Sequence, residues 1–244
     1  MRVAVLAAAV AAVELLCRSG VIARFTMIPP GEMVVALAGI LASGRMTAAI
    51  VRTLRNVGIA LGSSLVVGFV LGAALHAMPR VRRTVDPLFA SYYAIPVYAF
   101  YPLFIVLFGL GDVPQIAIGF LLAVVSMIMS TLNGFDRIPG VLLKTARIYR
   151  LHRVRTALRV MLPWAAPYIF TGAKMAVAYS FIGVIGAEFI MSGSGMGYEI
   201  AFAYNNFDNR VMYPLIMLVL MLVTMINMTL HSWERVLFDR RRRH

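Results

Sequence analysis

The sequence predicts an all-α membrane protein with about six transmembrane helices. Its 244 residues are 61% hydrophobic and only 14% charged, and the mean hydropathy is +0.85. A soluble domain is about half apolar and a quarter charged, so this composition indicates segments that lie in lipid. Apolar stretches alternate with short basic segments, and no linker divides the chain. We therefore expect a single transmembrane domain over residues 1–244.

Each apolar stretch approaches the length of about 20 residues that a helix needs to cross the hydrocarbon core. The first stretch is short and follows Arg2, so it is either a retained helix or a secretory signal. We favour the retained helix, because no small-residue cleavage site is clear. The predicted spans are residues 3–19, 56–78, 88–110, 113–131, 168–191 and 211–231.

The segments between the first spans contain residues that interrupt helices. Residues 20–55 read as a connector broken at Pro29 and Pro30, with a short interfacial helix over residues 46–55. The tight basic loop at residues 79–83 follows the second span. Pro96 and Pro102 lie inside the third span, where they bend the chain and release backbone carbonyls.

One long segment, residues 139–163, is too basic to lie in lipid. Leu151, Val154, Leu158 and Met161 recur at helical spacing and form an apolar stripe, while arginines cover the remaining surface. Pro139 and Pro163 suit the start and the stop of one helix. Such a helix either lies on lipid headgroups or offers its stripe to a groove of another protein, and we favour the protein partner.

Charge asymmetry predicts the orientation. Most of the 23 Lys and Arg residues lie at the N-terminus, in residues 79–83, in residues 137–159 and in the C-terminal tail. Short loops rich in Arg and Lys remain in the cytoplasm, so these segments and both termini are predicted to face inward. The net charge of +13 is therefore read as topogenic, and no nucleic-acid-binding module is visible.

The motifs that an enzyme or an autonomous ATPase would need are missing from the sequence. Neither Lys144 nor Lys174 belongs to a phosphate-binding G-x4-G-K-[ST] loop. No HExxH, paired-carboxylate or Ser/His/Asp pattern occurs in the spans, and the four histidines are too scattered for a metal site. Cys17 is the single cysteine, which excludes a disulfide framework. We expect no catalytic residue, no metal and no cofactor on this chain.

Ionisable groups within the spans leave a second function open. The fifth span contains Lys174 and Glu188, and intramembrane charges often serve ion-coupled carriers. The two residues are separated by about 21 Å of helix rise, too far for a direct pair. Lys174 is expected to snorkel, and a structural hydrogen bond from Glu188 to the following glycine loop is favoured over a path-lining role. Candidates for lining a translocation path are Tyr98, Ser126, Ser130, Tyr179 and Glu188, with helix packing favoured for the two tyrosines.

Several motifs occur in an order that resembles a known family. The segment Pro139-x4-Lys144-Thr-Ala-Arg147 is followed by a basic helix, Leu-Pro163, Pro167 and Gly172. Asp86-Pro-Leu, Ala94-Ile-Pro, Tyr101-Pro-Leu and Phe108-Gly-Leu-Gly precede it. Gly186-Ala-Glu188 and Gly193-x-Gly-Met-Gly-Tyr198 follow it. Over residues 45–243 this set resembles the inner-membrane permeases of ABC transporters, in the nitrate, sulfonate and taurine branch.

The resemblance implies that the basic segment is the coupling helix that contacts the ATPase. Lys144 stands where the family has glutamate, Thr145 replaces an alanine, and Arg150 occupies the position of a glycine that permits a turn. We therefore expect a straighter or differently bent element and an ATPase with acidic residues. The coupling positions carried over are Lys144, Thr145, Ala146, Arg147, Arg150, Leu151, Val154, Leu158 and Pro163.

The resemblance also implies the type I ABC importer permease fold and a set of partners. These are cytoplasmic ATPase subunits that hold ATP and Mg²⁺, a second permease copy in a homodimer, and a periplasmic binding protein. Lipid surrounds the spans in a bacterial inner membrane. The implied cargo is a small anion such as a sulfonate or nitrate, or a vitamin-like heterocycle. An outer gate, or a contact for the binding protein, is implied at Gly193, Gly195, Gly197 and Tyr198.

Overall fold

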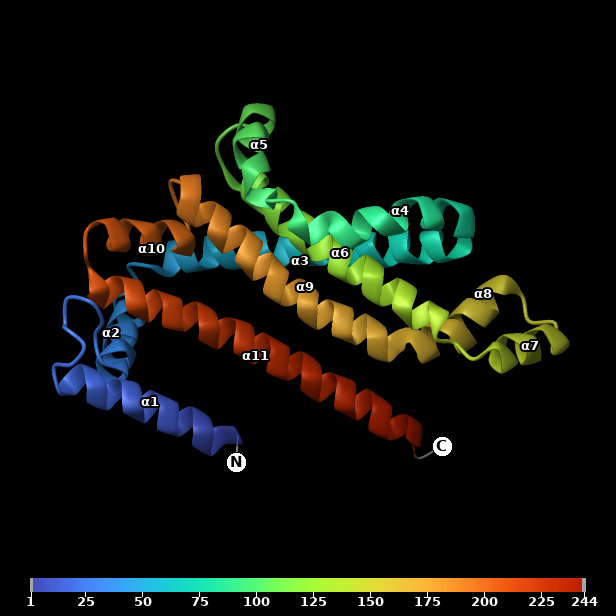
Figure 1. Ribbon diagram of the computed structural model, residues 1–244, viewed down its shortest axis with the longest axis horizontal. Coiled ribbons are helices and arrows are strands. Elements are labelled where there is room, and N and C mark those ends of the chain that lie inside the picture. Colours follow the sequence, from blue (N-terminus) through green and yellow to red (C-terminus); the bar gives the residue numbers. More distant parts are fainter. Residues whose placement is uncertain (1, 243–244) are drawn as a thin grey trace. The chain divides into compact units, whose positions relative to one another are not determined.

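The computed structural model describes residues 2–242, which form helices joined by short turns (Figure 1). Two compact units share the chain, and three helices pass from one into the other. Unit 1 comprises residues 1–55 and 185–224, and unit 2 comprises residues 56–184 and 225–244. Each unit is described separately.

Unit 1 is built from three shorter helices and parts of three long ones. It contains α1 (Arg2–Arg18), α2 (Pro30–Ser43), the start of α3 (Thr47–Ala77), the end of α9 (Leu162–Met191), α10 (Met196–Asn205) and the first part of α11 (Asn209–Arg242). Leu37, Met196 and Leu218 form its buried cluster. The turn after α1 is tied to α11, because Asn209 and Tyr213 donate hydrogen bonds to the carbonyls of Phe25 and Thr26.

Unit 2 is organised on α6 (Asp112–Asp136), of which 61% of the apolar window is buried. Val124, Val125, Ile128 and Leu132 of α6 form the core. The other elements are α4 (Pro79–Ser91), two short 3₁₀ turns (Tyr92–Ala94 and Val97–Phe100), α5 (Tyr101–Phe108), α7 (Gly140–Ile148), α8 (Arg153–Thr156) and a π turn (Ala157–Met161) that leads into α9.

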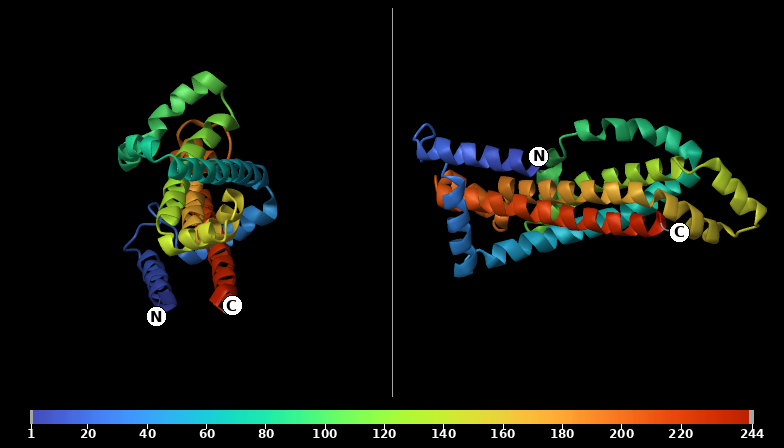
Figure 2. Two further views of the ribbon diagram at one scale, coloured as in Figure 1. Left: turned by 90° about the vertical axis from the view of Figure 1, so that its right-hand side faces the viewer. Right: turned by 90° about the horizontal axis from the view of Figure 1, so that it is seen from below.

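Small residues let α6 approach its neighbours closely. A Cβ atom added at Gly72 of α3 would lie 2.7 Å from the Cβ of Thr131, and one at Gly172 of α9 would lie 2.5 Å from the Cβ of Ser130. Gly183 packs in the same way against the backbone of Gly119. Figures 1 and 2 show α6 and this part of α9 running alongside each other. Close backbone approach of this kind is how membrane helices gain packing energy, since lipid supplies no hydrophobic drive.

The count of six spans is approximate. Among residues 2–242, four helices are long and apolar enough to cross a membrane, or five if a bent pair counts as one span. The four are residues 47–77, 112–136, 154–190 and 209–234. The first predicted span is helical, but α1 has 17 residues. The predicted spans at 113–131, 168–191 and 211–231 fall within longer helices.

The predicted connector over residues 20–55 was wrong in two respects. Residues 30–43 form α2, because Pro30 suits a first helical turn, no further proline follows, and Gly44 ends the helix in the left-handed conformation. The predicted interfacial helix over residues 46–55 is not separate, since α3 continues from Thr47 to Ala77. Thr53 and Asn56 are fully buried, so this part of α3 is a packed helix and not a surface one.

The region around Pro96 differs from the single span predicted for residues 88–110. Helical turns on either side of the proline meet at 91°, which makes this pair a broken span or a re-entrant loop. The basic residues 79–83 were predicted as a loop but form the first turns of α4, with Pro79 at its start. Pro96 lacks an N–H and restricts Ile95 to extended backbone, so the helix ends there.

We predict that Gly183→Ala lowers the free energy of unfolding by about 1–3 kcal/mol, the usual cost of overpacking. Its new Cβ would lie 2.5 Å from the Cα of Gly119, and a backbone atom cannot rotate away. Gly62→Ala is the matched control, because no atom lies within 4 Å of that position and alanine favours the helix. Thermal unfolding of the purified chain in detergent measures both variants; equal stability for both would contradict the packing described.

Candidate functional site

The basic segment between α6 and α9 is bent and not a single helix. α7 ends at Ile148, and residues 149–152 form a turn before α8 begins at Arg153. Arg150 has a φ of +49°, in the left-handed region that a glycine usually occupies. We expected a straighter or a differently bent element, and of these two alternatives the straighter one was wrong, because Arg150 itself adopts a left-handed turn conformation.

The end predicted for this segment was also wrong. Pro163 does not stop a helix, because it follows the π turn over Ala157–Met161 inside a continuous helix, and a π turn accommodates an irregular hydrogen-bond pattern without ending the helix. The chain is helical from Arg153 through the π turn to Met191. Leu151 lies in the turn, so the predicted stripe of Leu151, Val154, Leu158 and Met161 does not run along one helix.

The surface of the segment combines apolar and basic side chains. Ile148 and Tyr149 are 78% and 75% exposed at the end of α7. Val154 and Leu158 are also exposed, whereas Leu151 is half-buried and Ala146 is buried. Lys144, Thr145, Arg147 and Arg150 are exposed around them. The apolar stripe predicted from sequence periodicity did not include Ile148 and Tyr149, although both come directly before Arg150.

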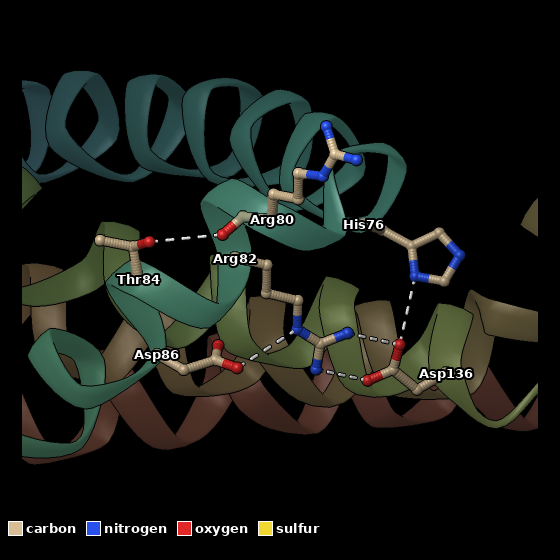
Figure 3. A network of polar contacts seen from close by, with 6 residues as sticks. All are labelled: His76, Arg80, Arg82, Thr84, Asp86 and Asp136. Carbon is tan, nitrogen blue, oxygen red and sulfur yellow. Dashed lines mark hydrogen bonds and ion pairs between the residues drawn. The ribbon is translucent and has the colours of Figure 1, made fainter.

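An ion-pair network fixes the point at which α6 passes into this segment (Figure 3). The Arg82 guanidinium of α4 donates two hydrogen bonds to the Asp136 carboxylate, at 2.7 and 2.6 Å. His76 of α3 contacts the same carboxylate at 3.2 Å, and Asp86 lies 3.6 Å from the Nε of Arg82. A bidentate Arg–carboxylate pair sets both distance and orientation. The end of α6 is thereby joined to α3 and α4.

The other end of the segment returns to the same place. The indole N–H of Trp164 in α9 donates to the carbonyl of Arg137 at 3.1 Å. The Arg137 guanidinium lies 5.4 Å from the ring centre of Tyr168, a cation–π contact. Residues 137–164 therefore form a projection that is closed at its base, and we call them the coupling loop after the role proposed for them below.

A second polar cluster, in unit 1, surrounds Glu188. This carboxylate is fully buried and accepts a hydrogen bond from the N–H of Gly197 at 2.9 Å. The Thr53 hydroxyl lies 2.9 and 2.8 Å from its two oxygens and accepts the N–H of Met196 at 2.8 Å. α9 and α3 thus supply the N-terminal cap of α10, where a carboxylate is stabilised by the helix dipole. The hydrogen bond expected between Glu188 and the glycine loop is present.

The glycines of this loop have a steric role. A Cβ atom at Gly195 or Gly197 would overlap the side chain of Glu188, and Gly195 has a φ of +106°. Gly193 has open space around it, and Tyr198 is half-buried with its ring against Phe202. Only two of the three glycines are therefore required by the contact with Glu188.

The candidate path residues of unit 2 all make packing contacts. The Tyr98 hydroxyl donates to the carbonyl of Ile182, and the Tyr179 ring stacks on Tyr93 at 5.5 Å. Ser126 is buried and bonds its own helix at Ala123, and Ser130 lies against Gly172. Contacts of this kind agree with the packing role favoured for Tyr98 and Tyr179.

Several polar partners were missed from the sequence. Lys174 forms an ion pair with Glu234 of α11 at 2.5 Å, and His231 lies 3.3 Å from the same carboxylate. Asn56 donates to Asp112 and to Gln115. His231 and Glu234 are three residues apart on α11, but the other partners are about 60 residues apart in the chain, so no local pattern could have paired them. No group of three His, Cys, Asp or Glu side chains suited to a metal occurs in residues 2–242.

The known proteins that this chain resembles include permease subunits of three transport systems. The nitrate import permease protein NrtB of Leptolyngbya laminosa is 30% identical over 160 residues, covering 66% of this chain and 57% of that protein. The taurine transport system permease protein TauC of Escherichia coli K12 is 25% identical over 75% of this chain and 66% of that protein. The bicarbonate transport system permease protein CmpB of Synechococcus elongatus is 32% identical over 57% and 50%. The chain thus spans little more than half the length of the first relatives.

The fold has a counterpart among solved structures. A chain of the MetNI methionine ABC transporter, in an inward-facing crystal form, superposes with a TM-score of 0.67 at 19% identity, covering 79% of this chain and 95% of that one. This confirms the predicted type I importer permease fold. The family model described as "Binding-protein-dependent transport system inner membrane component" matches residues 64–244. With its several membrane-spanning helices, the chain therefore belongs to the family of inner-membrane permease components of binding-protein-dependent transport systems.

Proposed function

We propose that this chain is the transmembrane subunit of an ATP-driven importer for a small solute. ATP and Mg²⁺ are held by separate cytoplasmic ATPase subunits, and a periplasmic binding protein delivers the solute. A second copy of the chain completes the path. Family membership supports this assembly, and the arginine distribution supports an inward-facing coupling loop with both termini in the cytoplasm.

The observation that carries the proposal is the surface of the coupling loop. Ile148, Tyr149, Val154 and Leu158 expose apolar area beside Lys144, Arg147 and Arg150. Exposed apolar side chains rimmed by charge are typical of a protein contact. The base closed by Arg82, Asp136 and Trp164 would transmit movement of a docked ATPase into α3, α4, α6 and α9.

The substrate class is proposed from the relatives. NrtB, TauC and CmpB are named for nitrate, taurine and bicarbonate, which are small solutes that carry an anionic group. We propose a small anion of this kind, such as nitrate or a sulfonate, ahead of a vitamin-like heterocycle. Chemical selection is assigned to the binding protein.

An ion-gradient carrier is the less favoured function. Lys174 is paired with Glu234, and Glu188 caps α10 together with Thr53. Both intramembrane charges thus have structural partners, which leaves no specific support for proton coupling. Membership of a binding-protein-dependent family also argues against it.

We predict that Ile148→Asp and Tyr149→Asp each reduce co-purification of the ATPase subunit by at least about tenfold, because central contacts of an interface dominate its affinity. Val21→Asp is the matched control: it is 74% exposed but lies in the turn after α1. ATPase recovered per permease is measured on affinity-purified complexes. Unchanged recovery for both loop variants would contradict docking at this surface.

We predict that Thr53→Val and Glu188→Ala reduce uptake by about tenfold or more while ATPase recovery is unchanged, because each leaves backbone N–H groups of α10 without a partner. Ser63→Ala is the control, since that hydroxyl bonds only the preceding turn of α3. Uptake of labelled solute in whole cells measures the effect. Normal uptake by both variants would show that the α10 cap has no part in transport.

We predict that vesicles containing the full transporter take up solute only with ATP inside and binding protein outside. Uptake that follows an imposed proton or sodium gradient without nucleotide would instead establish the ion-gradient carrier. A vesicle with the permease alone is the control, and we expect no accumulation there.

A further inference from the structure

Two cavities in unit 1 are lined by residues of α1 and α2. The first has a volume of about 560 Å³ and is lined by Arg18, Ile28, Gly31, Glu32, Val35, Ala36 and Arg210. The second has a volume of about 570 Å³ and is lined by Ala7, Val10, Ala11, Glu14, Pro30, Gly31 and Val34. Gly31 lines both cavities and is therefore a wall that they share.

The first cavity presents the guanidinium groups of Arg18 and Arg210, and the Glu32 carboxylate that also lines it is paired with Arg24 at 3.5 Å. The Nε–H of Arg18 donates a hydrogen bond to the Glu14 carboxylate at 2.6 Å. An arginine side chain has five N–H donors, so the others remain available to a ligand. Arg210 bonds Asp208 through its backbone N–H, and among residues 2–242 its side chain makes no hydrogen bond or ion pair. Paired arginines recognise oxyanions such as phosphate through several donors at once.

The second cavity is apolar along α1. Ala7, Val10 and Ala11 lie on successive turns of that helix, and Val34 of α2 closes the other side. Val10 and Val34 are more than half exposed. Glu14 is the one charged residue, and its carboxylate is occupied by Arg18 and by the N–H of Gly31 at 2.8 Å. This groove suits a hydrocarbon chain.

We propose that these cavities form a binding site for one glycerophospholipid, with its phosphate between Arg18 and Arg210 and an acyl chain along α1. A free oxyanion would use the arginines but would leave the groove beside them empty. A soluble protein segment would need polar partners for its backbone, and the groove along Ala7, Val10 and Ala11 offers none. Cationic ends and apolar flanks are how membrane proteins hold lipid head groups at the interface.

Native mass spectrometry of the full transporter, released into mild detergent, tests the proposal by counting retained phospholipid. We expect Arg210→Ala to lower phospholipid affinity by about tenfold, because one hydrogen bond to a charged group is lost. Ala11→Phe fills the groove without altering charge, and the same loss is expected. Arg45→Ala is the control, since Arg45 is exposed but lines neither cavity.

The source of the phosphate is tested in the same preparation. A large excess of inorganic phosphate should not displace the lipid, because phosphate cannot occupy the groove. Displacement by phosphate, or unchanged lipid retention in both Arg210→Ala and Ala11→Phe, would overturn the proposal. Retention lost in Arg45→Ala to the same extent would overturn it as well.

Discussion

The ion pair between Arg82 and Asp136 determines where the apolar bundle of unit 2 ends and the basic projection begins. Its two short hydrogen bonds hold the last turn of α6 against α4, and His76 adds α3 to the same carboxylate. Trp164 returns the chain to Arg137, one residue later. Because the projection leaves and re-enters the bundle at one place, it can be as charged as it is without drawing α6 or α9 out of their packing. The coupling loop depends on this closure.

A second constraint acts on the polar groups inside the units. Lipid offers no hydrogen bonds, so the backbone N–H and C=O groups freed at a break in a helix need partners within the protein itself. At the start of α10 the partners are Glu188 and Thr53, and the absence of side chains at Gly195 and Gly197 makes room for the carboxylate. Along α6, glycines on α3 and α9 allow close packing. In both places, therefore, the glycines allow close contact and do not supply flexibility.

Composition and periodicity predicted what depends on local sequence. Apolar length located the cores of α3, α6, α9 and α11, and the motif around Glu188 indicated its bond to the glycine loop. The predictions failed where the local structure depends on contacts with other parts of the chain. Arginines at 52 and 55 suggested a surface helix, yet burial of Thr53 and Asn56 makes α3 continuous. Arg150 gave no sign of a left-handed turn, because a turn held by neighbouring helices overrides the residue's own preference. Pro163 lies inside a continuous helix behind a π turn, and the sequence gives no signal for that turn.

The central claim, that the coupling loop faces the cytoplasm and meets the ATPase, is tested most directly with a single cysteine. Cys17 is buried and is the chain's only cysteine, so Ile148→Cys in a Cys17→Ala background places one reactive thiol at the tip of α7. A membrane-impermeant thiol reagent should label it only in permeabilised cells, and co-expressed ATPase subunits should block the labelling. Labelling in intact cells, or labelling that the ATPase leaves unchanged, would contradict the account.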